Sequence, residues 1–400
     1  MSSKAHPAAP APAPAAPARL EASNARCSLS LTLPPPGVCY PGQTLHPVLR
    51  FKGDTRYDKL SLRLKADSPL RVWGKDRWQA GAVASATLGG GGGVPVTNLE
   101  RYLFIDEDIP LTSSGRHEVG DHKKGGSAQE ASPQDGVYEF VVPYPPGRQL
   151  LPALPAVEGF TDGAQASVSW RLEFEGDRHG WYRTNDKLHL ELPVVMPVRV
   201  PPDSLDVQTV KGLKYQGHDR QNLTIAARLV CDPPQHADAT LHYRLTLNPT
   251  NDITRSMLDS ALSASATSPV KPTASLARQV RTSPIKAENG QDFDWAATRV
   301  AGGTLEREHG GEQQGSPGEL AWVGQLVVPH GHHTVQSQHL DVNYILNCHL
   351  RSSLFPSGDL HLSLPVLLPS APAGLTAQRE AELAAEAPEA SGSALPPYEP

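Results

Sequence analysis

Apolar and polar residues alternate along much of the chain. A period of two places successive side chains on opposite faces of an extended strand, so one face can be buried while the other is hydrated. Turns rich in Gly and Pro separate these stretches. The pattern therefore predicts short antiparallel strands that form β-sandwiches. The clearest alternating stretches are residues 28–33, 60–64, 138–142 and 168–174 in the first half, and residues 223–230, 241–247, 320–328 and 340–346 in the second.

Part of the sequence occurs twice. Residues 188–197 read LHLELPVVMP and residues 360–369 read LHLSLPVLLP, with seven of the ten letters unchanged. Upstream, the pattern V-x-W-x-L at 168–172 is matched by V-x-Y-x-L at 342–346. Self-similarity at this long period predicts two tandem domains of one architecture rather than a solenoid of short repeats.

We therefore predict an all-β fold of two tandem antiparallel β-sandwiches, in residues 25–200 and 201–370. The Ala/Pro-rich residues 1–24 and the Ala, Pro and Glu-rich residues 371–400 are predicted to be disordered tails, because they hold too few large apolar side chains to offset the entropy of ordering. Insertions with the same deficit are predicted to be mobile loops at residues 89–93, 113–136, 256–289 and 302–318.

The composition limits the classes of function. A formal net charge of -6 supplies no cationic surface, so we expect no nucleic-acid binding. No stretch of about 18 apolar residues is present, and the N-terminal residues lack the apolar core of a secretion signal, so a cytoplasmic protein is expected. The cysteines show no C-x-x-C spacing, which predicts neither a zinc ribbon nor a disulfide framework: they are Cys27, Cys39, Cys231 and Cys348.

Several motifs follow one another in an order seen in a known family. Residues 39–45 read CYPGQTL, where Pro41 and Gly42 suit a turn that needs a positive φ. Tyr138-x-Phe140 leads into the proline-rich residues 143–146, and a V-x-W-x-L strand closes on LHLELPVVMP. Together these features resemble an arrestin N-domain, and the second copy resembles an arrestin C-domain. The resemblance covers about residues 25–370 and implies two β-sandwiches.

The C-terminal residues Leu395, Pro396, Pro397 and Tyr398 match the L/P-P-x-Y pattern that WW domains read. Proline preorganises a polyproline II ligand, and the tyrosine ring can fill an apolar slot. Arrestin-like domains followed by such a motif resemble the α-arrestins, the arrestin-related trafficking adaptors. The family commonly carries more than one motif, whereas this chain has one, so its engagement lacks avidity.

This resemblance implies an adaptor rather than an enzyme. The expected partners are a WW-domain HECT ubiquitin ligase and the cytosolic tails of membrane transporters or receptors, whose ubiquitination and endocytosis the adaptor promotes. The protein would be cytoplasmic and recruited peripherally to the plasma membrane or endosomes. Residues Lys59, Arg63 and Lys65 share one face of a predicted strand and are candidates for contact with acidic cargo or an anionic membrane surface. The alternative is an ordinary solvated strand face.

Regulatory sites are also implied by the resemblance. Lys211 and Lys214 are candidate ubiquitin acceptors just past the domain seam. Candidate phosphosites, each a serine before a proline in a predicted loop, are Ser132, Ser268, Ser283 and Ser316. The run His330-Gly331-His332-His333, with His339 beyond it, reads as an exposed loop rather than a metal site. We expect no catalytic residues, no metal and no cofactor, because no nucleophile motif is present.

Two other interpretations stay open. The fold could serve as a trafficking or signalling scaffold, like retromer-like subunits or the pH-signalling arrestins, without recruiting a ligase. Alternatively, the chain could be an unrelated two-domain β-sandwich that binds carbohydrate or a cell-surface ligand. Secretion or disulfide formation would favour the second alternative.

Overall fold

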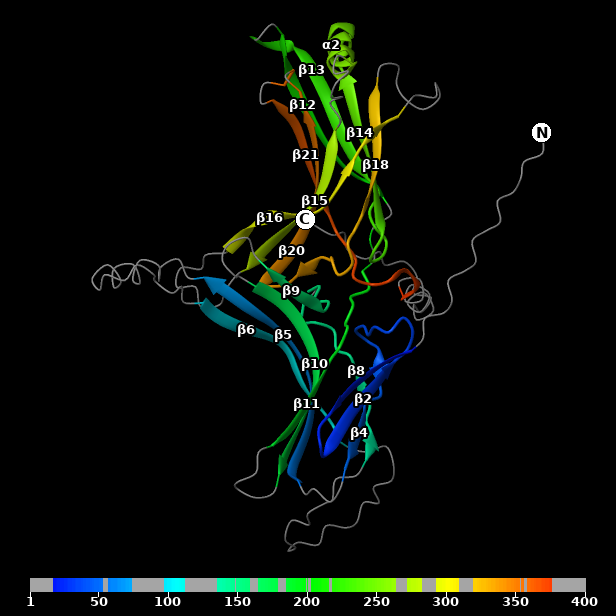
Figure 1. Ribbon diagram of the computed structural model, residues 1–400, viewed down its shortest axis with the longest axis vertical. Coiled ribbons are helices and arrows are strands. Elements are labelled where there is room, and N and C mark those ends of the chain that lie inside the picture. The colour runs from blue at the N-terminus through cyan, green and yellow to red at the C-terminus, as the bar shows by residue number, and fades with distance from the viewer. Residues whose placement is uncertain are drawn as a thin grey trace, which may run out of the picture. The chain divides into compact units, whose positions relative to one another are not determined.

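The computed structural model describes residues 17–52, 57–73, 97–111, 135–147, 149–158, 165–178, 185–198, 200, 203–215, 218–263, 272–282, 293–308, 319–352, 354–355 and 358–375. Antiparallel β-strands dominate this part of the chain, and the predicted all-β fold is confirmed (Figure 1). The helix α2 (Asp252–Ser263) follows β14 along the chain.

The strands of the first half form two main sheets and a short pair, β3 (Thr44–Leu45) with β8 (Phe140–Val141). Strands β1 and β2 of the first sheet contact β11 of the second, which makes a sandwich. The first sheet has the order β1 (Ala18–Ser23), β2 (Cys27–Leu33), β4 (Val48–Phe51), β7 (Gly136–Val137). The second has the order β11 (Asp186–Glu191), β10 (Gln165–Arg178), β5 (Tyr57–Trp73), β6 (Thr97–Ile109), and β9 (Leu154–Glu158) also pairs with β10.

The strands of the second half also form two sheets that face each other, with β12 and β13 of one in contact with β21 of the other. One sheet has the order β12 (Leu205–Tyr215), β13 (His218–Cys231), β14 (Thr240–Pro249), β18 (Leu320–Val327), β17 (Glu306–Arg307). The other has the order β16 (Phe293–Thr304), β15 (Thr273–Thr282), β20 (Leu340–Arg351), β19 (Val335–Gln336), and β21 (Asp359–Val366) also pairs with β20.

The sequence repeat corresponds to a repeat of topology. In one sheet β9 and β11 both pair with β10, followed by β5 and β6; in the other, β19 and β21 both pair with β20, followed by β15 and β16. Leu172 pairs with Leu190 in the first sheet, and Leu346 pairs with Leu364 in the second. Equivalent residues of the two hairpins, such as Leu190 and Leu364, are thus 174 positions apart in the sequence, whereas the repeated decapeptides are 172 positions apart. A two-residue shift leaves every side chain on its own face, so both sequences keep the same strand pairing.

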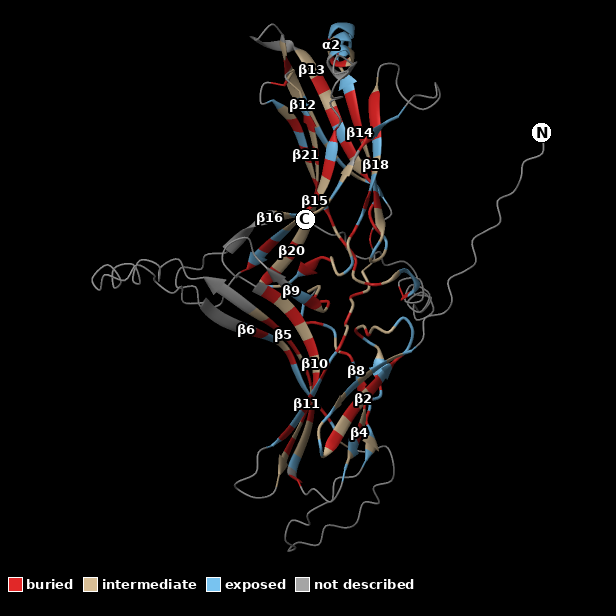
Figure 2. Cartoon of the chain, viewed as in Figure 1, coloured by how far each residue is buried: buried red, intermediate tan, exposed pale blue. Residues whose placement is uncertain are grey.

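Alternate side chains of these strands make the core. Strand β20 is buried at every second residue over almost its whole length, and Figure 2 shows the same alternation along β10. Trp170, Phe174 and Tyr344 are among the largest fully buried side chains. Because each strand buries one face and hydrates the other, the period-two pattern of the sequence translates directly into two-layer packing.

The chain divides into two compact units. One comprises Met1–Asp67, Leu103–Pro145 and Ser169–Val195; the other comprises Ser68–Tyr102, Pro146–Val168 and Met196–Pro400. Strands β5, β6 and β10 belong partly to each unit. The division into compact units does not test the predicted domain boundaries, 25–200 and 201–370, which stay predictions.

Two predicted loops and one predicted tail contain regular structure. The prediction of a mobile insertion at residues 256–289 is wrong where α2 and β15 lie, and that at residues 302–318 is wrong at the end of β16 and at β17. The prediction of a disordered tail at residues 1–24 is wrong at β1, which pairs with β2. Strand β15 is internal to its sheet, between β16 and β20, but two of its four apolar residues are alanines, and the stretch therefore resembled a linker. Helix α2 begins with an N-cap: the side-chain Oδ1 of Asn251 accepts hydrogen bonds from the backbone N and Oγ1 of Thr254, both at 2.8 Å.

The turn predicted at CYPGQTL is confirmed. Gly42 has a φ of 87°, which favours glycine, and the backbone N of Gln43 donates to the carbonyl of Tyr40 at 3.1 Å. This turn places β3 beside β8, with Leu45 opposite Phe140.

Replacing Trp170 with alanine should lower the free energy of unfolding by about 3–5 kcal/mol, because a fully buried ring is lost and a cavity remains. Denaturant unfolding of the full chain measures this change. The control is Val327→Ala on an exposed position of β18, which should change stability by less than about 0.5 kcal/mol. Similar losses in the two variants would contradict the assigned core.

Candidate functional site

The WW-ligand motif, Leu395 to Tyr398, lies outside the described residues. The four candidate phosphosites lie outside them as well: Ser132, Ser268, Ser283 and Ser316. Both assignments stay predictions from the sequence.

The candidate contact residues on β5 do not form a purely basic surface. Arg63 Nε lies 2.7 Å from Asp108 Oδ1, and Lys65 Nζ lies 2.7 Å from Glu173 Oε2. Lys59 is exposed on the same strand. Two of the three positive charges are therefore offset by carboxylates on β6 and β10.

The candidate ubiquitin acceptors Lys211 and Lys214 both lie on β12 and are half-buried. The backbone N of Lys214 donates to the carbonyl of Leu354 at 2.7 Å, which holds the end of this strand. Their role stays a prediction.

The side chains of His330 and His332 contact different residues. His330 Nδ1 lies 3.2 Å from Asp238 Oδ1, and His332 Nδ1 lies 3.2 Å from the hydroxyl of Tyr344. His333 is buried, and burial lowers its pKa to about 4. Within the described part of the chain, no three His, Cys, Asp or Glu side chains come together as metal ligands.

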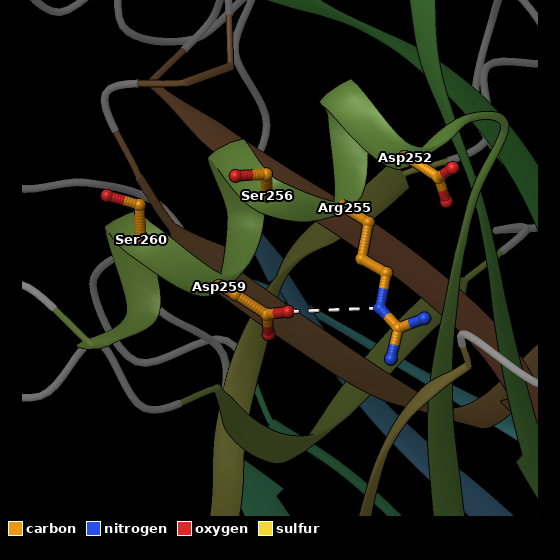
Figure 3. Close-up of a pocket in the computed structure, with 5 residues that line it drawn as sticks. All are labelled: Asp252, Arg255, Ser256, Asp259 and Ser260. Carbon is orange, nitrogen blue, oxygen red and sulfur yellow. Dashed lines mark ion pairs between the residues drawn. The ribbon is translucent and has the colours of Figure 1, made fainter.

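The surface hollow beside α2 is not a binding cleft. Figure 3 shows that its lining residues all come from this one helix, and Arg255 points toward Asp259 with Nε and Oδ2 3.9 Å apart. Asp259 also lies 3.2 Å from Arg307 Nη2. Side chains from successive turns of one helix, most of them exposed, enclose no ligand and are a solvated helix face.

A buried polar cluster surrounds Asp186. The Asp186 residue is 6% exposed, and its Oδ2 accepts a hydrogen bond from the hydroxyl of Tyr57 at 2.9 Å. Its Oδ1 lies 3.3 Å from Asn24 Nδ2 and 3.3 Å from Arg26 Nη1. Arg178 Nε lies 3.9 Å from Oδ2. The Asp186 cluster thus joins the β1–β2 turn to β5, β10 and β11.

Electrostatics give this cluster a structural role. Burial, and then the hydrogen bond and charge of Asp186, raise the pKa of Tyr57, so its hydroxyl stays a neutral donor. Two guanidinium groups, those of Arg26 and Arg178, lie beside this one buried carboxylate. A carboxylate held in this way is a clamp between strands rather than a proton donor or acceptor.

The sequence holds a signal for the Asp186 cluster that the strand analysis missed. Asp186 has the same parity as Leu188 and Leu190 on β11, so alternation places a carboxylate on the buried face. A charged residue at an inward position requires a partner. The identity of that partner could not be read, because Arg26, Tyr57 and Arg178 come from distant parts of the sequence.

The cysteines are free and buried. Burial raises the pKa of Cys39, Cys231 and Cys348 to about 12. Burial and the charge of Asp186 raise the pKa of Cys27. The thiols are therefore protonated at neutral pH, a state that suits neither nucleophilic attack nor metal binding.

No protein-family model matches the chain, and no curated protein matches it either. The antiparallel sheets are compatible with an arrestin-like β-sandwich fold.

Helices long and apolar enough to cross a bilayer are not found among the residues that the structure describes.

Replacing Asp186 with asparagine should lower the free energy of unfolding by about 3 kcal/mol, because it removes the buried charge that lies beside Arg26 and Arg178. Denaturant unfolding at pH 7 checks this. The matched control is Asp108→Asn, which removes an exposed partner of Arg63 and should cost at most about 1 kcal/mol. Equal costs would show that the Asp186 cluster is not a clamp.

Acid should weaken the fold through His333. Its folded pKa of about 4 lies below the ordinary 6.5, so the unfolded chain takes up this proton first and stability falls as the pH drops through that interval. The shift corresponds to about 3 kcal/mol. Unfolding midpoints of wild type and His333→Gln at pH 7 and pH 4.5 measure it.

The His333→Gln variant should lose about 2–3 kcal/mol less than wild type between these two pH values. The control is Val327→Ala, at an exposed position without a titratable group, and it should keep the wild-type dependence. An unchanged dependence in His333→Gln would refute the assignment.

Proposed function

We propose that this protein is an adaptor that recruits a WW-domain HECT ubiquitin ligase to membrane transporters or receptors and so promotes their ubiquitination and endocytosis. The observation that carries the proposal is the sequence Leu395-Pro396-Pro397-Tyr398, which follows a duplicated β-sandwich scaffold of the arrestin-like kind. The α-arrestin subfamily, in which these two features occur together, is part of the proposal.

The physical basis of ligase recruitment is a preorganised ligand. Pro396 and Pro397 restrict the backbone to a polyproline II conformation, so little entropy is lost on binding. The ring of Tyr398 then supplies apolar area and a hydroxyl for a hydrogen bond. The motif begins 20 positions after Leu375, the last described residue. Because the chain has one such motif, binding of an isolated WW domain is expected to be weak.

Cargo recognition is proposed at the outer face of β5. The ion pairs Arg63–Asp108 and Lys65–Glu173 involve side chains that are partly exposed, and exposed pairs of this kind contribute at most about 1 kcal/mol. An acidic segment of a cargo tail or an anionic headgroup can therefore compete with Asp108 or Glu173 at small cost. Lys59 adds a third positive charge on the same strand.

Regulation of the adaptor is proposed through covalent modification. Ubiquitin would be attached at Lys211 or Lys214 on β12. Phosphate would add about two negative charges at a serine that precedes proline. The candidate serines are Ser132, Ser268, Ser283 and Ser316.

Replacing Tyr398 with alanine should reduce capture of the full chain by immobilised WW domains at least tenfold, because the group that fills the apolar slot is removed. Binding to purified WW domains of HECT ligases measures this. The matched control is Tyr144→Ala, a tyrosine that is 65% exposed and also flanked by prolines, and it should retain capture. Undiminished capture of the Tyr398 variant would count against ligase recruitment through this motif.

A further inference from the structure

Exposed apolar side chains gather in the stretch from β7 to the end of the proline-rich segment. Three of the eight large apolar side chains that are exposed in the described chain lie here: Val137 at 50%, Val141 at 53% and Tyr144 at 65%. The stretch ends in the sequence Pro143-Tyr144-Pro145-Pro146, which we name the proline run. The adaptor function proposed above does not use it.

The sequence of the proline run restricts its backbone. Each proline holds φ near -65°, and Tyr144 and Pro145 each precede a proline, which disfavours the helical region for them. Residues 143–145 therefore favour extended, polyproline II-like geometry, and the chain bends at Pro146. In that geometry there are three residues per turn, so Pro143 and Pro146 share one edge of the segment.

The burial pattern shows which edges are accessible. Pro145 is buried, whereas Pro146 and Tyr144 are exposed and Pro143 is half-buried. The edge of Pro145 is thus packed against the protein, the edge of Tyr144 faces outward, and the edge of Pro143 and Pro146 is exposed at Pro146 and partly exposed at Pro143. A groove that contacts two edges of a polyproline II helix can therefore reach the edge of Tyr144 and the edge of Pro143 and Pro146.

The proline run is held at its start and ends sharply. The backbone N of Val142 donates to the carbonyl of Gln43 at 2.9 Å, and the carbonyl of Val142 accepts from the N of Gly42 at 2.8 Å. Gly147 has a φ of 69°, which ends the extended conformation. A ligand ordered before it binds loses less entropy than a free peptide does.

We propose that the proline run is a docking segment for a partner domain with an aromatic-lined groove of the SH3 type. Pro143 and Pro146 have the P-x-x-P spacing that such grooves read. Tyr144 adds an exposed ring between them, and Val141 extends the apolar surface upstream.

The proline run and the C-terminal motif suit different readers. A WW domain of the kind expected for Tyr398 reads a proline two positions before the tyrosine. Tyr144 has Val142 at that position, and its proline is directly adjacent. The P-x-x-P spacing also occurs at six other places in the sequence. Variants of the proline run itself are therefore needed to assign SH3 binding to it and to separate it from the C-terminal motif.

The test uses the purified full chain and a panel of immobilised SH3 domains, with WW domains on the same array. At least one SH3 domain should capture the wild type. The double variant Pro143→Ala/Pro146→Ala should lower that capture at least tenfold, because both prolines of the shared edge are removed. Pro155→Ala, at an exposed proline of β9, and Tyr398→Ala should both retain it.

Failure of every SH3 domain to capture the wild type would overturn the proposal, as would capture that persists in the double variant or falls equally in Pro155→Ala. A synthetic peptide of residues 140–149 tests SH3 binding independently of whether the double variant folds. It should displace the wild-type chain from the same SH3 domain, and failure to displace it would overturn the proposal. Loss of WW capture in Tyr398→Ala with retained SH3 capture distinguishes this segment from the ligase motif.

Discussion

Burial of alternate side chains along paired strands is the constraint on which the rest of this structure depends. Strands β10 and β20 each bury one face completely, and the hairpins that they form with β11 and β21 keep equivalent pairs such as Leu172–Leu190 and Leu346–Leu364. A shift of one residue would turn every leucine outward, whereas a shift of two is tolerated. The decapeptides repeat after 172 residues and their partner strands after 174, and the same sheet order is still formed twice because the difference is two residues.

The ion pairs around this apolar core differ in how much free energy it costs to break them. The buried Asp186 requires Arg26, Arg178 and Tyr57, because an unpaired carboxylate in this place would be strongly destabilising. The Arg63–Asp108 pair on the outer face of β5 is exposed and costs little to break, and the Lys65–Glu173 pair is partly exposed. The Asp186 cluster therefore holds strands together, whereas the pair at Arg63 contributes little to stability.

The sequence predicted the fold class and the repeat because both depend on local periodicity. It predicted the turn at Gly42 for the same reason, since the need for a positive φ is a local property. It missed β15, whose alanines bury little area by themselves and are covered only because β16 and β20 flank them. It also missed the Asp186 cluster, since the partners of this carboxylate are brought together only by strand pairing. For a long-range contact of this kind, the local sequence shows only a polar residue at an inward-facing position and does not show its partner.

In the adaptor that we propose, two β-sandwich halves are joined to short proline-containing ligands. One chain would then hold a ligase and a membrane cargo at the same time. The most direct measurement is proximity labelling in the native cell by the full chain, with Tyr398 intact or replaced by alanine. The account predicts that wild type labels a WW-domain HECT ligase together with a membrane transporter or receptor, and that the variant loses the ligase but keeps the cargo. Equal labelling of the ligase by both chains, or labelling of neither class of protein by wild type, would contradict it.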